Sequence, residues 1–351
     1  MNGYVVGRLR HSRRAAIIGL IMLLSLTLAE KSIAQATGAV PVAAPIPPGM
    51  ETVDFFSPAV QRRMKFDIVL PQDYYSSDER YPVLYLLHGY MQNYTVWGRN
   101  LAAAYYARKL NDLILVLPDA GNSWFINYAV SEDGQTNNWE DHIIKDVIGY
   151  VDANFRTEAR REGRAIAGLS MGGFGAYSLG LRHPEMFVSL GSTSGALSHA
   201  RTAAAAISSG ISGGTDTRSS APRDSERQAR IDEADAFISK IIDIPGFSTQ
   251  DERTPKGIDF ETAEQAEAYD PFAIIYNVPR SQMPHLYMDA GTEDGLVNEA
   301  RELAQLLMLN DVPFDYMQSE GRHNSEYWRR SIGHMLTIQH EVMQRALGKR
   351  P

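Results

Sequence analysis

The chain has 351 residues, of which 44% are apolar and 22% charged, values close to the averages of globular proteins, so a disordered, fibrous or multi-span membrane protein is excluded. Because it contains no cysteine, disulfide bonds, thiolate metal sites and a cysteine nucleophile are excluded as well. The formal net charge of −8 at pH 7 repels nucleic-acid phosphates and anionic lipids, so nucleic acid is not an expected partner.

The N-terminal residues have the composition of an export signal. Arginines precede an uncharged apolar run at 15–29, and a small-x-small cleavage site ends at Ala36. The apolar run is shorter than the roughly 20 residues that a membrane-spanning helix needs. We therefore predict a signal peptide at 1–36 and a secreted or periplasmic protein without a membrane span after its removal; an uncleaved N-terminal anchor is the alternative. Residues 37–50 are rich in Ala, Pro and Gly and are predicted to be a linker.

From residue 51 onward, short apolar runs alternate with longer amphipathic segments. The runs at 82–87 and 113–117 are continuously apolar, as expected for strands that are buried on both faces of a parallel sheet. This alternation predicts one α/β domain at 51–351, with a mostly parallel central sheet and helices on both faces. The predicted strands are 64–70, 82–87, 113–117, 165–167, 187–190, 285–288 and 314–317, and the predicted helices are 95–110, 139–154, 297–309 and 327–346.

One long segment interrupts the alternation. Residues 197–271 separate two predicted strands, whereas an ordinary crossover needs only about a dozen residues. Within this segment apolar residues recur at helical spacing from Ile231 to Ile242, which predicts an amphipathic helix. Long loops of compact domains are usually functional or disordered. We therefore predict a helical, lid-like insertion at 197–271, and a decorated surface loop is the alternative.

The sequence Gly168-Leu169-Ser170-Met171-Gly172 matches the pattern G-x-S-x-G and stands between a predicted strand and a run of small residues. A serine hydroxyl becomes a useful nucleophile when a sharp strand-to-helix turn holds it where a histidine can reach it. Glycines permit that turn without side-chain clashes, and the N-terminal amides of the following helix favour developing negative charge. Ser170 is therefore the predicted nucleophile.

Hydrolysis of an ester passes through a tetrahedral oxyanion, which two positioned N–H groups can stabilise. The residue after the nucleophile, Met171, is expected to supply one of them. The loop after the strand at 82–87 is expected to supply the other, which we assign to Tyr90, because Gly89 allows the backbone to approach closely. His88 is expected to form a structural hydrogen bond rather than to act as the base.

The nucleophile requires a histidine base and a carboxylate that orients it. In doubly wound α/β enzymes with this motif, the acid and then the histidine follow the serine along the chain. His323 follows the strand-like run at 314–317 and is the predicted base. Asp294 follows the strand at 285–288 and is the predicted acid, with Asp289 and Glu293 as alternatives.

Aromatic residues and metal ligands are the remaining candidates for substrate or cofactor binding. Trp97 and its aromatic companions line a carbohydrate or aromatic acyl pocket in one interpretation and fill the core in the other. The sequence contains neither His-Glu-x-x-His nor a glycine-rich phosphate loop after a strand, so no metal and no cofactor are expected. The aromatic companions are Trp124, Tyr128, Trp139 and Trp328.

Four segments, taken in this order, resemble the esterase D family of α/β-hydrolases: LLHG at 86–89, GLSMGG at 168–173, GTED at 291–294 and GRHNSEYW at 321–328. That family includes feruloyl and acetyl-xylan esterases, S-formylglutathione hydrolases and mycolyltransferases of the antigen 85 type. The resemblance covers about 55–195 and 270–345 and implies the α/β-hydrolase fold. By it, the family nucleophile, acid and base correspond to Ser170, Asp294 and His323, and the oxyanion positions to Tyr90 and Met171.

The chain departs from the family around the histidine. The family usually has Gly-Gly-His-Asp there, whereas this chain has Arg322 before His323 and Asn324 after it. We expect Arg322 to contact an anionic or hydroxylated substrate.

Together these observations predict a secreted serine esterase that hydrolyses carboxylic esters, including feruloyl or acetyl esters of carbohydrates, through an acyl-enzyme. The expected partner is a small-molecule or carbohydrate-linked ester. An acyltransferase of the mycolyltransferase type with the same triad, and a non-catalytic binding protein on a hydrolase scaffold, are the alternatives. The sequence leaves the oligomeric state open.

Overall fold

The computed structural model describes residues 46–132, 134–209 and 253–349. The predicted signal peptide and most of the predicted linker therefore lie outside the described residues. The middle of the predicted insertion, with the amphipathic helix expected between Ile231 and Ile242, lies outside them too. Within the described ranges, no helix has both the length and the apolar character needed to cross a bilayer.

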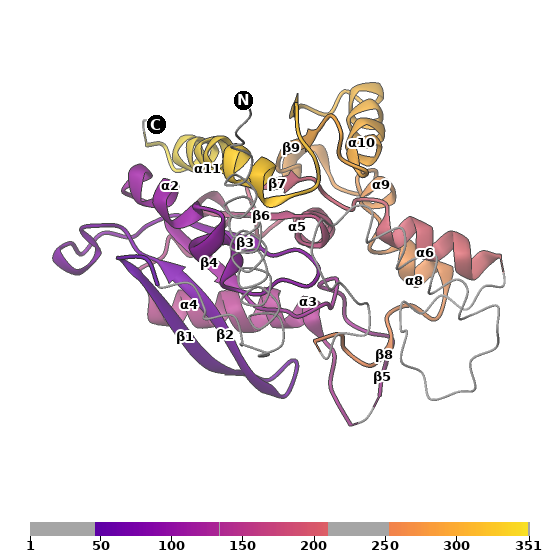
Figure 1. Ribbon diagram of the computed structural model, residues 1–351, viewed down its shortest axis with the longest axis horizontal. Helices are drawn as coiled ribbons and strands as arrows, with labels where there is room; N and C mark the ends of the chain where they lie inside the picture. The colour runs from indigo at the N-terminus through magenta and orange to yellow at the C-terminus, as the bar shows by residue number, and fades with distance from the viewer. Residues whose placement is uncertain (1–45, 133, 210–252, 350–351) are drawn as a thin grey trace, which may run out of the picture. The chain divides into compact units, whose positions relative to one another are not determined.

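The described residues form an eight-stranded sheet in the order β1-β2-β4-β3-β6-β7-β9-β10 (Figure 1). The first three strands in this order pair antiparallel, and every pairing from β4 to β10 is parallel. The predicted mostly parallel sheet is thus confirmed. The strands are β1 (Met50–Ser57), β2 (Arg62–Val69), β3 (Val83–Leu87), β4 (Ile114–Pro118), β6 (Arg164–Leu169), β7 (Ser189–Thr193), β9 (His285–Gly291) and β10 (Phe314–Ser319).

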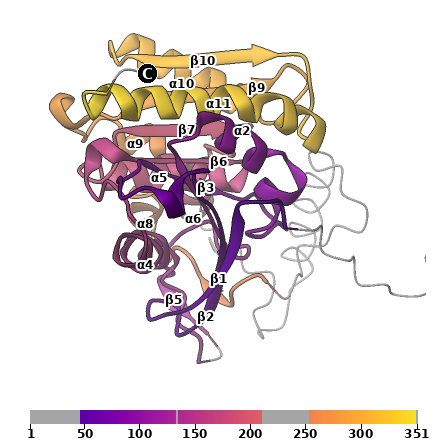
Figure 2. The same ribbon diagram turned by 90° about the vertical axis from the view of Figure 1, so that its left-hand side faces the viewer.

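The helices cover both faces of this sheet, as the sequence predicts. One apolar layer contains side chains of α2 and α11, and another contains side chains of α4, α5 and α10. Figure 2 shows α2 and α11 near each other from a second direction. The helices are α2 (Ala103–Leu110), α3 (Trp139–Asp141), α4 (Ile148–Asn154), α5 (Met171–Arg182), α6 (His199–Ser208), α8 (Ala263–Glu267), α9 (Pro271–Ile274), α10 (Val297–Leu309) and α11 (Ser325–Ala346).

The apolar composition of the central strands explains why they lie in the interior of the sheet. Every residue of β3, β4 and β6 is buried, which matches the continuously apolar runs predicted for strands covered on both faces. Shorter helical turns connect the elements at Tyr74–Ser76, Val96–Asn100, His142–Val147, Arg161–Gly163 and Arg280–Gln282.

Two local expectations are wrong. The helix predicted over 95–110 is interrupted, because Ala102 has a left-handed φ of 63° between the turn at Val96–Asn100 and α2. Burial of Trp97 and Leu101 in the apolar layer overrides helix propensity here. The predicted linker ends one residue too late, since Met50 already begins β1, an outer strand whose pairing with β2 the sequence pattern did not indicate.

The described parts of the predicted insertion pack on the domain. Helices α6 and α8 lie side by side, and a small apolar cluster joins them to Phe174 of α5. Farther along, β8 (Gly257–Ile258) pairs with β5 (Val130–Ser131). The role of the insertion as a lid stays a prediction.

Candidate active site

Ser170 stands at the sharp turn between β6 and α5. Its backbone has φ 52° and ψ −118°, a conformation that is strained for a residue with a side chain. A Cβ at Gly168 would lie 2.3 Å from backbone atoms of Gly172, and a Cβ at Gly172 would lie 2.4 Å from the carbonyl oxygen of Leu87. Both glycines of the G-x-S-x-G motif are therefore required by close backbone approaches.

A chain of hydrogen bonds joins three side chains from three loops. Nε2 of His323 lies 3.0 Å from Oγ of Ser170, and Nδ1 of His323 lies 3.1 Å from each carboxylate oxygen of Asp294. These residues follow β6, β9 and β10, parallel strands whose carboxyl ends meet at one edge of the sheet. The structure thus brings together the three residues that the sequence proposes for nucleophile, acid and base. In this arrangement an imidazole can accept the serine proton.

Asp294 is a buried carboxylate, only 3% exposed. Burial raises its pKa, but the hydrogen bond and charge of His323 and the N–H of Leu296, 2.8 Å from Oδ1, outweigh this effect and lower the pKa below its ordinary value. The ionised carboxylate can therefore accept the Nδ1–H of His323 at neutral pH. That hydrogen bond leaves Nε2 of His323 as the acceptor facing Ser170.

The two alternative acids have other partners. Asp289 accepts hydrogen bonds from Thr193 Oγ1 at 2.5 Å and from Tyr287 Oη at 2.9 Å. Its complete burial raises its pKa to about 6. Glu293 is exposed and pairs with Arg322 at 2.9 Å. Of the three candidates, Asp294 is the one whose carboxylate contacts the histidine.

The loop after β3 lies against the nucleophile. A Cβ on Gly89 would lie 3.4 Å from the Cβ of Ser170. The carbonyl oxygen of Gly89 accepts a hydrogen bond from Nδ1 of His88 at 2.8 Å. Because the C=O and N–H groups of a trans peptide point in opposite directions, the N–H of Tyr90 points away from His88. Met171, the first residue of α5, offers one of the N–H groups that a helix leaves without an intrahelical partner.

His88 is a structural residue, as predicted. It is 1% exposed, and its Nε2 accepts a hydrogen bond from the N–H of Ala120 at 3.1 Å. Both ring nitrogens are therefore used within the fold. Through its bond to the Gly89 carbonyl, His88 orients the peptide that carries the Tyr90 N–H.

Comparison with known proteins places the chain in a family. The sequence model of the Esterase family matches residues 57–337. The chain belongs to the Esterase family. This assignment confirms the resemblance that the four motifs indicate.

Three curated relatives extend the comparison. The chain is 38% identical over 135 residues to an esterase of Mycobacterium tuberculosis, covering 37% of this chain and only 28% of that protein. It is 24% identical over 287 residues to an acetyl esterase of Caldicellulosiruptor saccharolyticus, covering 80% and 94%. It is 32% identical over 156 residues to an endo-1,4-beta-xylanase/feruloyl esterase of Xylanibacter ruminicola, covering 42% and 21%.

A solved structure supports the fold. An S-formylglutathione hydrolase from Staphylococcus aureus superposes with a TM-score of 0.59 at 20% identity, over 83% of this chain and 98% of that one. Together with the strand order, this likeness confirms the predicted α/β-hydrolase fold.

The two residues expected to contact substrate, Trp97 and Arg322, differ in their exposure to solvent in this Esterase-family chain. Trp97 is 1% exposed, and its Nε1 donates to the carbonyl oxygen of Leu87 at 2.8 Å, so it packs inside the fold and its burial argues against a contact with substrate. Arg322 is well exposed, next to His323 in sequence, and forms the ion pair with Glu293.

The other aromatic candidates divide in the same way. Tyr128, Trp139 and Trp328 are buried, whereas Trp124 is half-buried. The indole of Trp124 stacks on the imidazole of His199, with centroids 3.5 Å apart and planes 3° apart. Its ring centroid also lies 5.9 Å from that of Tyr90. Trp124 is therefore an aromatic side chain with accessible surface near the loop after β3.

Sequence reasoning missed two polar contacts around the site. Asn324 caps α11, since its side chain accepts the N–H of Tyr327 at 3.1 Å; an asparagine before an amphipathic run is a recognisable signal for such a cap. Asn122 hydrogen bonds to the backbone of Met91, and no local sequence signal announces this contact.

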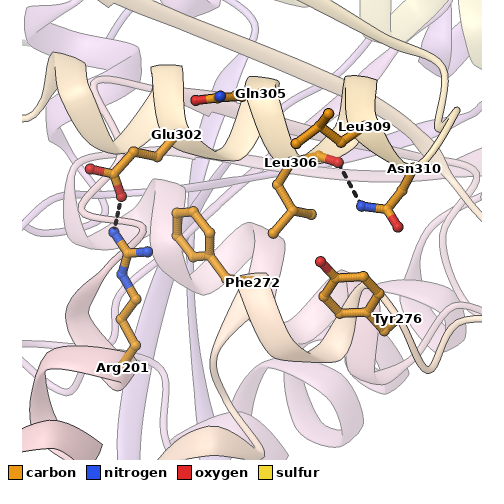
Figure 3. Close-up of a pocket in the computed structure, with 8 residues that line it drawn as sticks. All are labelled: Arg201, Phe272, Tyr276, Glu302, Gln305, Leu306, Leu309 and Asn310. Atoms are coloured by element: carbon orange, nitrogen blue, oxygen red, sulfur yellow. Dashed lines mark hydrogen bonds and ion pairs between the residues drawn. The ribbon is translucent and has the colours of Figure 1, made fainter.

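The structure also contains a groove that none of the triad residues line. It has a volume of about 280 Å³ and lies between α6, α9 and α10, with Arg201 paired to Glu302 at one side (Figure 3). Among the described residues, no group of three or more His, Asp or Glu side chains is placed to hold a metal ion.

Proposed function

We propose that this protein is a serine esterase that hydrolyses carboxylic esters. The observation that carries the proposal is the hydrogen-bonded chain from Ser170 through His323 to Asp294, at 3.0 and 3.1 Å. Burying these polar groups costs free energy unless they hydrogen bond to one another. The same arrangement of serine, histidine and carboxylate activates a serine hydroxyl. Membership of the Esterase family supports the same reaction class.

The reaction divides into two halves. Oγ of Ser170 attacks the ester carbonyl carbon while Nε2 of His323 takes its proton, and the carbonyl oxygen becomes an oxyanion. The N–H groups of Tyr90 and Met171 stabilise that oxyanion. The bond to the alcohol oxygen then breaks, and His323 returns the proton to the leaving alcohol. Asp294 remains a carboxylate throughout and stabilises the imidazolium.

Water completes the cycle. A water molecule attacks the acyl-enzyme carbonyl and gives its proton to His323. The second tetrahedral oxyanion that forms accepts hydrogen bonds from the same two N–H groups. The bond to Ser170 breaks, the carboxylic acid leaves, and His323 returns the proton to Oγ of Ser170.

The proposed substrates are acetyl or feruloyl esters of carbohydrates or other small molecules. Two relatives are named for acetyl and feruloyl esters. The half-buried ring of Trp124 and the exposed guanidinium of Arg322 are the proposed contacts for an aromatic acyl group or a hydroxylated or anionic part of the substrate. Export to the periplasm or the medium, proposed from residues 1–36, favours esters met outside the cytoplasm.

A labelling experiment tests the proposal. A fluorophosphonate probe should label the protein, and Ser170→Ala should lose both the label and the turnover of p-nitrophenyl acetate. Ser178→Ala is the matched control, because Ser178 is a buried serine of α5, the helix that follows Ser170, and lies outside the triad. Absence of labelling in the unmodified protein would favour a binding protein, and retained turnover in Ser170→Ala would contradict the assigned nucleophile.

A substrate panel then defines the class. Initial rates with acetyl, butyryl, feruloyl and thioester substrates should favour acetyl or feruloyl oxygen esters. The same assay with added sugar acceptors measures acyl transfer. Transfer that outruns hydrolysis would replace the esterase proposal with an acyltransferase.

A further inference from the structure

A buried side-chain amide joins the loop after β3 to a distant part of the chain. Asn122 is 1% exposed and lies in the loop that follows β4. Its Oδ1 accepts the backbone N–H of Met91 at 2.7 Å, and its Nδ2 donates to Oγ1 of Thr254 at 3.1 Å. The N–H of Met91 requires an acceptor, so these partners also settle which end of the amide is oxygen. The backbone N–H of Asn122 donates to the carbonyl oxygen of Arg253 at 3.1 Å.

The residue that Asn122 holds has an unfavourable backbone conformation. Met91 has a left-handed φ of 62°, which is uncommon for a residue other than glycine and costs free energy. Such a conformation persists when surrounding contacts determine it, and the 2.7 Å hydrogen bond from Met91 to Asn122 is one of those contacts. Loss of this acceptor would allow the peptide between Tyr90 and Met91 to rotate.

That peptide adjoins the proposed oxyanion donor. On the preceding side of Tyr90, the carbonyl oxygen of Gly89 is fixed by Nδ1 of His88 and by the N–H of Gln92 at 3.2 Å. On the following side, the peptide is fixed by Asn122. The N–H of Tyr90 therefore belongs to a peptide that His88 holds, and the next peptide along the chain is held by Asn122.

The segment 253–254 supports the same loop from outside. Oη of Tyr90 lies 3.4 Å from Oγ1 of Thr254, and a guanidinium nitrogen of Arg253 lies 3.5 Å from the carbonyl oxygen of Gln92. Asn122 is thus a buried residue that hydrogen bonds both to the loop at 90–92 and to the segment 253–254.

We propose that Asn122 is a positioning residue of the oxyanion hole: its amide fixes the Tyr90–Met91 peptide, and with it the N–H of Tyr90, against segment 253–254. The inference rests on the proposed esterase function. Asn122 does not touch the reacting atoms in this proposal and acts through the loop backbone. A displacement of about 1 Å in such a donor costs up to roughly a hundredfold in rate, because the donor must meet the oxyanion and not the ground-state carbonyl.

The first test compares two buried asparagines. Asn122→Ala should lower kcat for p-nitrophenyl acetate by about tenfold to a hundredfold, with KM changed by less than about threefold. Asn137→Ala is the matched control, because Asn137 is also buried. Its Nδ2 donates to the carbonyl oxygen of Lys256 at 2.8 Å, two residues after Thr254. Asn137→Ala should leave kcat within about twofold of the unmodified enzyme. Both alanine variants are assayed well below their unfolding temperatures.

A second readout separates positioning from general destabilisation. Oγ of Ser170 adds to the carbonyl carbon of a trifluoromethyl ketone while His323 takes the serine proton, and a tetrahedral oxyanion forms. The inhibition constant of the ketone should therefore rise in Asn122→Ala by about the factor by which kcat falls. Asn122→Asp keeps an acceptor for the N–H of Met91 and should recover most of the lost kcat. Thr254→Val removes the partner of Nδ2 while keeping the shape of the side chain, and should lower kcat by about threefold or more.

Three results would overturn the inference. Equal kcat in Asn122→Ala and Asn137→Ala would do so, as would an unchanged ketone inhibition constant in Asn122→Ala. If Asn122→Ala does not fold, Thr254→Val decides, and an unchanged kcat and inhibition constant in that variant would overturn the inference. Turnover that survives in Ser170→Ala would instead remove the proposed function itself.

Discussion

The imidazole of His323 packs edge-on against the indole of Trp328, with ring centroids 5.1 Å apart and planes at 88°. Trp328 lies in the first turn and a half of α11, and its N–H donates to the carbonyl oxygen of Asn324 at 3.2 Å. The position of the proposed base therefore depends on where this helix begins. Asn324, the residue between His323 and the helix, determines that start by capping it.

Loss of the α11 cap should destabilise the protein. Asn324→Ala leaves the N–H of Tyr327 without its side-chain acceptor, and the free energy of unfolding should fall by about 1 kcal/mol. Asn324→Asp preserves an acceptor at the cap and should stay within about 0.5 kcal/mol of the unmodified protein. Urea unfolding followed by circular dichroism measures both. Equal stability of the alanine and aspartate variants would show that the cap contributes little.

Removing the charge of Asp294 should be far more damaging to rate than to stability. Asp294→Asn keeps the shape of the side chain but no longer favours the tautomer in which Nε2 of His323 accepts the serine proton, so kcat should fall by about 10³- to 10⁴-fold. Glu293→Gln is the control, because Glu293 is exposed and pairs with Arg322 rather than with the histidine. It should retain kcat within about twofold. A larger loss in Glu293→Gln than in Asp294→Asn would reverse the assignment of the acid.

The close approach at Gly172 should not tolerate a methyl group. In Gly172→Ala the new Cβ would meet the carbonyl oxygens of Leu87 and His88 at 2.4 and 2.6 Å, so α5 must shift, at a cost of about 3 kcal/mol or more. Gly149→Ala, in α4, has nothing within 4 Å of the new Cβ and should gain about 0.5–1 kcal/mol from helix propensity. Thermal unfolding of the two variants should therefore move in opposite directions.

A buried carboxylate far from the triad should govern stability in acid. Glu140 accepts hydrogen bonds from His183 at 2.6 Å, from Tyr269 at 2.5 Å, and from Nε and Nη2 of Arg182 at 3.1 and 3.2 Å. Burial raises its pKa, but these partners outweigh burial and lower the pKa to about 2. Since the unfolded chain has a glutamate pKa near 4.3, the stabilisation is complete above that pH and is lost as the pH falls toward 2.

Glu140→Gln tests this linkage. At pH 7 the free energy of unfolding should fall by on the order of 3 kcal/mol, because the partners of the carboxylate lose its charge. The difference from the unmodified protein should shrink as the pH is lowered from about 4.5 toward 2. Urea unfolding at pH 7, 4 and 3 measures it, with Glu267→Gln, at an exposed glutamate, as the control. A difference that is constant with pH would contradict the linkage.

The sequence was sufficient to predict features that depend on residues close together in the chain. Gly168, Ser170 and Gly172 lie within five residues, so the turn that they permit can be read directly from the chain, and the buried apolar runs predict the central strands because a parallel sheet covered on both faces leaves them no polar side. The histidine could be chosen as well, since His323 follows a strand, whereas His334 and His340 lie within the helix predicted over 327–346.

Tertiary structure alone decided which distant groups meet. Asp289, Glu293 and Asp294 belong to one short stretch, and their distances from His323 depend on how β9 and β10 pair and where the loop turns, which the pattern of the stretch does not encode. Trp97 and Trp124 are equally aromatic, yet packing buries the first and leaves the second half-exposed. Asn122 meets Met91 across 31 positions, because contacts between separate loops arise from the packing of the whole sheet rather than from neighbouring residues.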